Sequence, residues 1–190
     1  MTTPHWKLIE EIIEVLQQNL LNAIVIAVLA SMAAIPGDRT GFVKKWIRCW
    51  RKREFRRHFF LLIYLSVLSS ITLLTRDYQP NPFREVIGKW FLKYRSGLWH
   101  HGNIENILLF LPLCPLVIMN IKRGHKYSII GLLWRGIILS LGATLLIEIL
   151  QAVFHRGTFQ LSDLFFNTIG GLIGLLFYMA VREIRRRRHG

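Results

Sequence analysis

The chain has little cysteine and little acidic charge, and both features limit the classes of protein to which it can belong. Its two cysteines, Cys49 and Cys114, form no CxxC pair, and one lies in a basic segment while the other lies in an apolar run, so we expect no disulfide between them. Only 11 Asp and Glu accompany 25 Lys and Arg, which gives a formal net charge of +14. The acidic start lacks the basic residues of a cleavable signal peptide, so we expect the first apolar run to stay in the mature protein.

Common catalytic and nucleic-acid-binding motifs are also missing. No HExxH, GxSxG or phosphate-cradling glycine loop occurs. The basic residues lie beside apolar runs, where anionic lipid and membrane topology explain them without nucleic acid. His100-His101 and the pair His155 and Asp163 are weak metal candidates and are more typical of headgroup-facing side chains. The sequence therefore predicts no cofactor, no bound metal and no nucleic-acid partner.

Long apolar runs are what the chain does have. Hydrophobic residues make up 52% of it, and the mean hydropathy is +0.35. A helix needs about 20 mostly apolar residues to cross a bilayer core of about 30 Å. Suitable runs cover residues 16–35, 58–75, 104–121, 136–154 and 164–181. We therefore predict an all-α, polytopic membrane helix bundle with about five transmembrane helices, the third of which is kinked by Pro112 and Pro115.

The segments between the spans carry further patterns. Residues 83–98 repeat apolar side chains at helical spacing, which predicts an amphipathic helix lying on the membrane. Residues 38–57 mix aromatic and basic residues, which favours a cytoplasmic loop that sets topology, with a patch for lipid headgroups or polyanions as the alternative. The chain thus divides into residues 1–57 (first span and basic loop), 58–182 (membrane domain) and 183–190 (basic tail).

The distribution of Lys and Arg predicts the orientation. Most of the 25 fall on one side if the C-terminus is cytoplasmic, because residues 37–57, the turn at 122–126 and the C-terminal tail are the basic segments. Cytoplasmic loops carry the excess of Lys and Arg. We therefore expect a multi-pass membrane protein with its N-terminus outside and its C-terminus in the cytoplasm.

Several polar residues lie inside the predicted spans, where an ionisable group costs several kcal/mol. Glu148 and Gln151 share one face of the fourth span, and Asp163 and Asn167 share a face of the fifth. The topology brings them to the outer leaflet, where the segment 155–163 covers them. The candidate binding residues are Asn106, Glu148, Gln151, Arg156, Asp163 and Asn167, and Gly170 and Gly174 are candidates for close helix packing. The alternative is that these polar groups only hold the helices together.

Two stretches, HGNIENILLFLPLCPL and LLIEILQAVFHRGTFQLSDLFFNTIGGLIG, resemble the VanZ-like family of bacterial membrane proteins. The family's pattern of an Asn before a Leu-Leu-Phe-x-Pro span, Glu-x-x-Gln, an Arg and Asp-x-x-x-Asn-Thr-x-Gly falls on Asn106, Phe110, Pro112, Glu148, Gln151, Arg156, Asp163, Asn167, Thr168 and Gly170. The resemblance covers residues 58–182. Cys114, Gln160 and Ser162 depart from it, and the last two replace common acids, which weakens any role that needs an acidic cluster.

The resemblance implies a function as well as a fold. The founding member of the family is associated with resistance to teicoplanin, a lipid-tailed glycopeptide. The resemblance therefore favours a membrane protein that binds a lipid-tailed glycopeptide or a lipid-linked envelope precursor among membrane lipids, over an enzyme. The alternatives are a membrane enzyme that uses Glu148 or Asp163 on a lipid or polyprenyl-linked substrate, and a structural partner of another membrane protein in a cell-envelope assembly.

Overall fold

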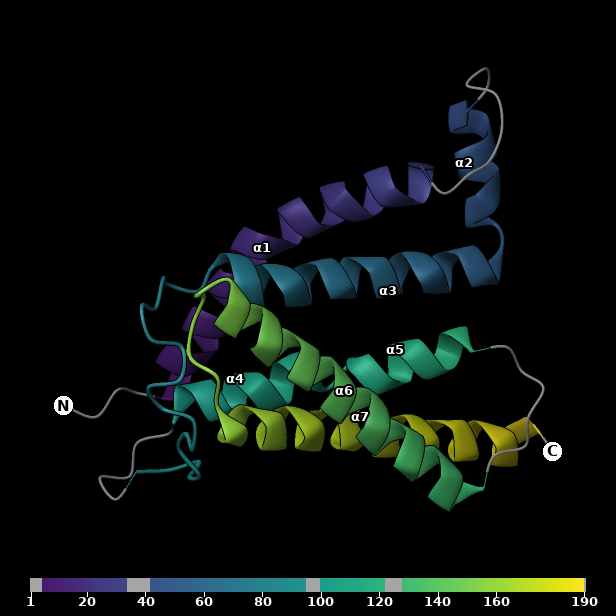
Figure 1. Cartoon of the computed structure of the whole chain (residues 1–190). Helices are drawn as coiled ribbons and strands as arrows, with labels where there is room; N and C mark the ends of the chain where they lie inside the picture. Colours follow the sequence, from purple (N-terminus) through teal and green to yellow (C-terminus); the bar gives the residue numbers. More distant parts are fainter. Residues whose placement is uncertain (1–4, 34–41, 95–99, 122–127, 190) are drawn as a thin grey trace.

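The computed structural model describes residues 5–33, 42–94, 100–121 and 128–189, and most of these are helical (Figure 1). Within those ranges there is no strand, only an isolated bridge between Tyr78 and Arg156. The elements are α1 (His5–Ala33), α2 (Phe42–Trp50), α3 (Arg53–Ser69), η1 (Ser70–Leu74), α4 (His101–Phe110), α5 (Leu113–Asn120), α6 (Ile129–Val153) and α7 (Leu161–His189). The prediction of an all-α membrane bundle is confirmed.

The long helices run side by side and alternate in direction along the chain (Figure 1). Among the described residues, four stretches are long and apolar enough to cross a membrane: Arg53–Leu74, His101–Asn120, Ile129–Val153 and Leu161–Arg188. Within α1, the apolar stretch Gln17–Ala33 is 17 residues long and is followed by residues outside the described ranges. The α1 helix begins at the end of the bundle opposite to the one where α7 finishes (Figure 1). We call the end near the start of α1 the N-terminal end and the other the basic end.

The third span is broken between α4 and α5, as the prolines predict. Pro112 has no N–H to donate to the preceding turn, and its ring disfavours a helical conformation there. The α5 helix then restarts with a hydrogen bond of 3.1 Å from Leu116 N to Pro112 O. Pro115 lies in the first turn of α5, where a missing N–H costs nothing.

The amphipathic helix expected at residues 83–98 is not present over 83–94, and residues 95–98 lie outside the described ranges. Two features stop a helix from forming. Gly88 adopts a left-handed φ of 72°. The carbonyl of Val86 accepts a hydrogen bond of 2.7 Å from Leu161 N, a distant residue, instead of closing a helical turn. The amphipathic helix is instead α2, within the stretch that we expected to be a loop.

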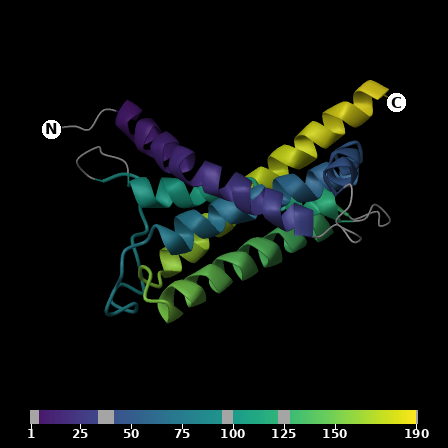
Figure 2. The same ribbon diagram turned by 90° about the horizontal axis from the view of Figure 1, so that it is seen from above.

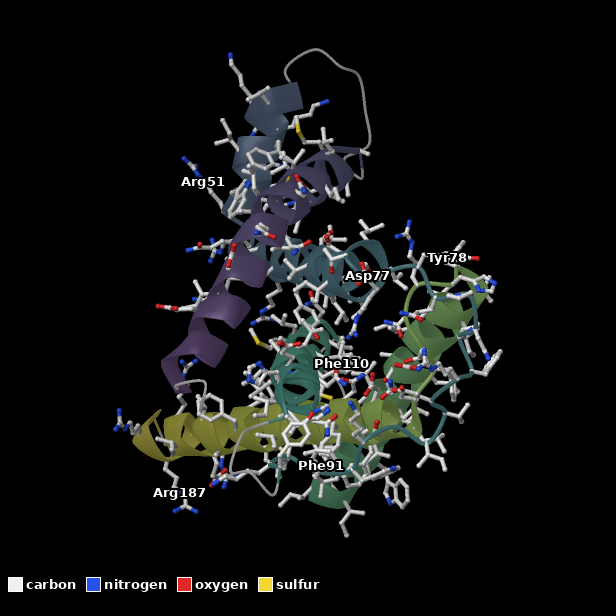
Figure 3. All side chains as sticks on the ribbon, turned by 90° about the vertical axis from the view of Figure 1, so that its left-hand side faces the viewer. Arg51, Asp77, Tyr78, Phe91, Phe110 and Arg187 are labelled. Atoms are coloured by element: carbon white, nitrogen blue, oxygen red, sulfur yellow. The ribbon has the colours of Figure 1, made fainter. Side chains whose placement is uncertain are left out.

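Helix α7 is central to the bundle because α4, α5 and α6 all pack against it. Its contact with α4 depends on small residues: a Cβ atom added at Gly170 would overlap the carbonyl of Ile107, and one at Gly174 would overlap the carbonyl of Leu111. Phe110 points into the middle of the bundle (Figure 3) and is completely buried. The glycines therefore let α7 approach the backbone of α4.

Helices α6 and α7 are antiparallel and meet at a constant register. Gly136 faces Leu175, Ser140 faces Gly171, and Asn167 Nδ2 donates to Thr144 Oγ1 at 2.7 Å. Each step of four residues along α6 is thus matched by a step of four back along α7. The next step pairs Glu148 with Asp163, whose carboxyl groups interact electrostatically. Packing of small residues at one end of the pair consequently determines which groups meet at the other.

We predict that Gly174→Ala lowers the free energy of unfolding by about 1–3 kcal/mol, because its methyl group cannot be placed without moving the backbone at Leu111, directly after α4. The matched control is Gly142→Ala in α6, where an added Cβ meets nothing within 4 Å and the better helix propensity of Ala applies. Thermal unfolding in detergent measures both. Equal melting temperatures for the two variants would contradict the close packing of α7 on α4.

Candidate binding site

Two carboxyl groups face each other where α6 ends and α7 begins, at the N-terminal end. Glu148 lies near the end of α6 and is only 2% exposed, and Asp163 lies half-buried in the first turn of α7. Gln160 N donates to Glu148 Oε2 at 2.8 Å, so the segment that joins α6 to α7 folds back over Glu148. The pair is held by the helix register on one side and by this backbone hydrogen bond on the other.

Hydroxyl and amide groups surround the acid pair. Asn106, buried on α4, hydrogen-bonds the side chain of Asp163, and Ser162 Oγ donates to Asp163 Oδ1 at 3.5 Å. Asn167 uses its Nδ2 on Thr144, while its Oδ1 is buried without a hydrogen-bond partner. An exchange of the amide O and N would only move the unpaired atom, so one polar atom of this buried side chain stays unsatisfied.

Gln151 ties α6 to the end of α3. Its Nε2 donates to the carbonyl oxygen of Thr72 at 2.7 Å. Thr72 belongs to the π-helical turn η1, and the last carbonyls of a helix have no partner within it. The Gln151 side chain thus satisfies a buried backbone group, and its amide is not directed at the carboxyl pair by any bond that we observe in the described residues.

Arg76, rather than Arg156, is the cation that acts on the acid pair. The charge of Arg76 interacts with both Glu148 and Asp163. Arg156 is exposed, and its Nη1 donates to the backbone carbonyl of Arg76 at 3.3 Å. Sequence reasoning placed Arg156 at the site because it lies just past the end of the span that carries Glu148 and matches the Arg of the family pattern. The signal for Arg76 was its position directly after the second span, at the end of the bundle where the acids lie.

Two segments cover the acid pair, and we call residues 75–94 and 154–160 together the cap. They are joined by hydrogen bonds of 2.8 Å from Gln79 N to His155 O and of 3.1 Å from Gly157 N to Asp77 O. Asp77 and Tyr78 lie beside the end of α6 (Figure 3). Gly157 has a left-handed φ of 94°, which brings the backbone close to the side chains of Arg76 and Gln151.

Asn103 holds the cap to α4 and was missed by the sequence analysis. Its Nδ2 donates to the carbonyls of Lys89 and Phe91, each at 2.8 Å. His100 caps the same helix by accepting from Asn103 N at 3.3 Å. Burial, together with the charges of Lys89 and His101, lowers the pKa of His100, which keeps the ring nitrogen free to accept. The asparagines near the start of α4 could have indicated a capped helix. They could not have indicated that Asn103 binds the loop at Lys89 and Phe91.

The cap presents apolar side chains around the site. Phe83, Ile87 and Trp90 are more than half exposed, and the ring of Trp90 contacts that of Phe165 of α7 in a tilted arrangement, with ring centroids 5.3 Å apart. A hollow of about 450 Å³ is lined by residues 83–89. In the described part of the chain, no three His, Cys, Asp or Glu side chains gather into a possible metal site. The site thus combines one buried and one half-buried acid, a nearby cation and an apolar rim.

A family model described as VanZ/LLP1 matches residues 55–182. The chain belongs to the VanZ/LLP1 family. The match confirms the resemblance found in the sequence and includes the acid pair, Arg76 and the whole cap. Helices α1 and α2 of this VanZ/LLP1 protein lie outside the matched residues. No curated protein and no solved structure matched the chain.

We predict that Arg76 and the acid pair depend on each other. Arg76→Gln should lower stability by no more than about 1 kcal/mol, since Arg76 is exposed and solvent screens its charge. The loss should vanish when Glu148→Gln and Asp163→Asn are already present, because Arg76 then has no charge to act on. Arg156→Gln is the matched control and should cost the same in both backgrounds. An identical response of the two arginine variants would contradict the assignment of Arg76.

We also predict coupling between Thr144 and Asn167. A double-mutant cycle with Thr144→Val and Asn167→Leu, measured by unfolding in detergent, should give an interaction energy of about 0.6–2 kcal/mol, the range for polar contacts between membrane helices. Ser140→Ala with Asn167→Leu serves as control, because Ser140 lies one turn away and should couple weakly. A Thr144–Asn167 coupling no larger than that of the control would rule out the register of α6 and α7.

Proposed function

We propose that this VanZ/LLP1 protein binds the polar headgroup of a lipid-tailed or lipid-linked amphiphile at Glu148 and Asp163, beneath the cap. The proposal rests on one observation: the carboxyl groups of Glu148 and Asp163 face each other where α6 ends and α7 begins. Ionisable groups inside spans are expensive and mark binding or transport paths more often than structural contacts. The hydrogen bonds Thr144–Asn167 and Gln151–Thr72 already join the helices, so the acids are not needed to hold the helices together.

The groups at the site suit a headgroup with both donors and acceptors. Carboxyl oxygens accept hydrogen bonds from hydroxyl and ammonium groups, and the Arg76 guanidinium can bind a phosphate or carboxylate. The unpaired amide atom of Asn167 is a further buried group that a ligand or water could satisfy. The exposed side chains of Trp90 and Phe165, which contact each other, suit an apolar tail.

The orientation is part of the proposal. The described basic segments, α2 with the start of α3 and the last turns of α7, lie together at the basic end of the bundle (Figure 1). The cytoplasmic side of a membrane protein carries the excess of Lys and Arg. We place the basic end in the cytoplasm of a bacterial cell, which puts the acid pair and the cap in the outer leaflet. There they would meet a lipid-linked envelope precursor or a lipid-tailed glycopeptide.

The alternative role, as a structural partner that contacts another membrane protein through Gly170 and Gly174, has less support. Both glycines are buried against α4 of the same chain, so their face is not open to another helix. A partner would need a different surface of the bundle. Binding at the acid pair needs no such additional assumption.

The test uses teicoplanin as the lipid-tailed probe, with the purified protein in nanodiscs. We expect wild type to bind it, and Glu148→Gln or Asp163→Asn to raise the Kd at least about tenfold, which corresponds to about 1.4 kcal/mol. In a sensitive Gram-positive host, wild type should raise the inhibitory concentration and the two variants should not.

The matched control is Glu105→Gln, because Glu105 is an exposed acid of α4 near the same end of the bundle. It should bind and protect like wild type. Equal Kd values and inhibitory concentrations for wild type and both site variants would contradict the proposal. An equal loss of binding in the Glu105 variant would contradict it as well. A glycopeptide without a lipid tail should bind more weakly to all of the proteins.

A further inference from the structure

Helix α2 lies across the end of the bundle instead of along it. In Figure 1 it runs roughly at right angles to α1 and α3, and in Figure 2 the same helix is seen nearly end-on. It sits at the basic end, where the chain passes from the first long helix to the next. A helix at that position and angle lies along the surface of the membrane that the other helices cross.

One side of α2 is fixed to the bundle through its tryptophans. Trp46 Nε1 donates to Ser31 Oγ of α1 at 3.0 Å. The ring of Trp50 packs on Phe59 of α3, with centroids 4.8 Å apart. Arg56 Nη1 donates to the carbonyl of Trp50 at 2.8 Å and so holds the end of the helix. Because of these contacts, the remaining faces of α2 have a defined direction.

Those remaining faces are an apolar ridge and a basic ridge. Val43 and Ile47, one helical turn apart, are 59% and 57% exposed. Lys44 and Arg48, also one turn apart and exposed, follow them around the helix. An apolar ridge beside a basic ridge is the arrangement by which a helix embeds in the boundary between headgroups and acyl chains.

The charge around α2 is almost entirely positive. Residues 42–57 include eight Lys and Arg and a single acid, Glu54. The arginines that end α7, 185–188, lie at the same end of the bundle (Figure 1). Two of them pair with Glu183 at 3.0 Å, and this pair is solvent-exposed. The surface that α2 offers is therefore complementary to a polyanionic layer and not to a neutral one.

We propose that α2 is a binding site for the headgroups of anionic phospholipids in the leaflet at the basic end. Val43 and Ile47 insert among the acyl chains, and Lys44 and Arg48 contact the phosphates and the other anionic oxygens. The tryptophan contacts hold α2 so that both ridges engage at once. This role belongs to the part of the chain outside the family match, and it does not depend on the acid pair.

The test compares lipids retained by the full-length protein. Wild type is reconstituted in nanodiscs of equal parts phosphatidylcholine and phosphatidylglycerol, and the lipids that remain after transfer to detergent are measured by native mass spectrometry. We expect phosphatidylglycerol to be enriched. In Lys44→Gln/Arg48→Gln the enrichment should fall about fivefold for each removed charge. Val43→Asn/Ile47→Asn should lower retention of both lipids, since it removes the inserted ridge.

The matched control, Arg84→Gln/Lys89→Gln, removes the same charge from exposed residues of the cap at the other end of the bundle. It should keep the wild-type enrichment. Hydrogen exchange of the α2 backbone in wild type gives a second readout that needs no variant, and it should be slower in phosphatidylglycerol than in phosphatidylcholine membranes. Equal retention of the two lipids by wild type, equal loss in the control, or equal exchange in the two membranes would each overturn the proposal.

Discussion

The constant register between α6 and α7 is the constraint on which the rest of the structure depends. Gly136, Ser140 and Thr144 follow each other at steps of four and meet Leu175, Gly171 and Asn167 in reverse order. Small residues at the inner steps let two helices approach closely without a hydrophobic driving force in lipid. Once this packing is set, the next step can only bring Glu148 and Asp163 together. The site is thus a consequence of helix packing several turns away.

The cap depends on the same constraint. Because the register holds the end of α6 beside the start of α7, the short joining segment must fold back, and Gln160 N reaches Glu148. That segment then supplies partners for residues 77–86, which pair with it instead of forming a helix. The Gln151–Thr72 bond brings the end of α3 to the same place, and Arg76 follows it directly. Polar groups from several segments therefore gather at one end of the bundle.

Sequence patterns predicted the helices well and their connections poorly. Runs of apolar residues indicated the spans, and the prolines indicated the break at Pro112, since both effects are local. The pairing of Glu148 with Asp163 could be expected from helical spacing and topology. The choice of Arg76 over Arg156 could not, because the Arg156 side chain donates to the backbone carbonyl of Arg76 in another loop and this contact is not local in sequence. The helix predicted at residues 83–94 was wrong for the same reason. The apolar residues have helical spacing, but the left-handed φ of Gly88 and the hydrogen bond from the distant Leu161 determine the backbone conformation.

Disulfide trapping tests the register most directly, in a background with Cys49→Ser and Cys114→Ser. Three positions suffice, because residue 167 of α7 can be paired with residue 144 or with residue 140 of α6. The structure predicts more cross-linking for Thr144→Cys with Asn167→Cys, whose native side chains are hydrogen-bonded, than for Ser140→Cys with Asn167→Cys, which are displaced by about one further helical turn, roughly 5–6 Å along the helices. Equal or better cross-linking of the 140–167 pair would contradict the register and, with it, the meeting of Glu148 and Asp163.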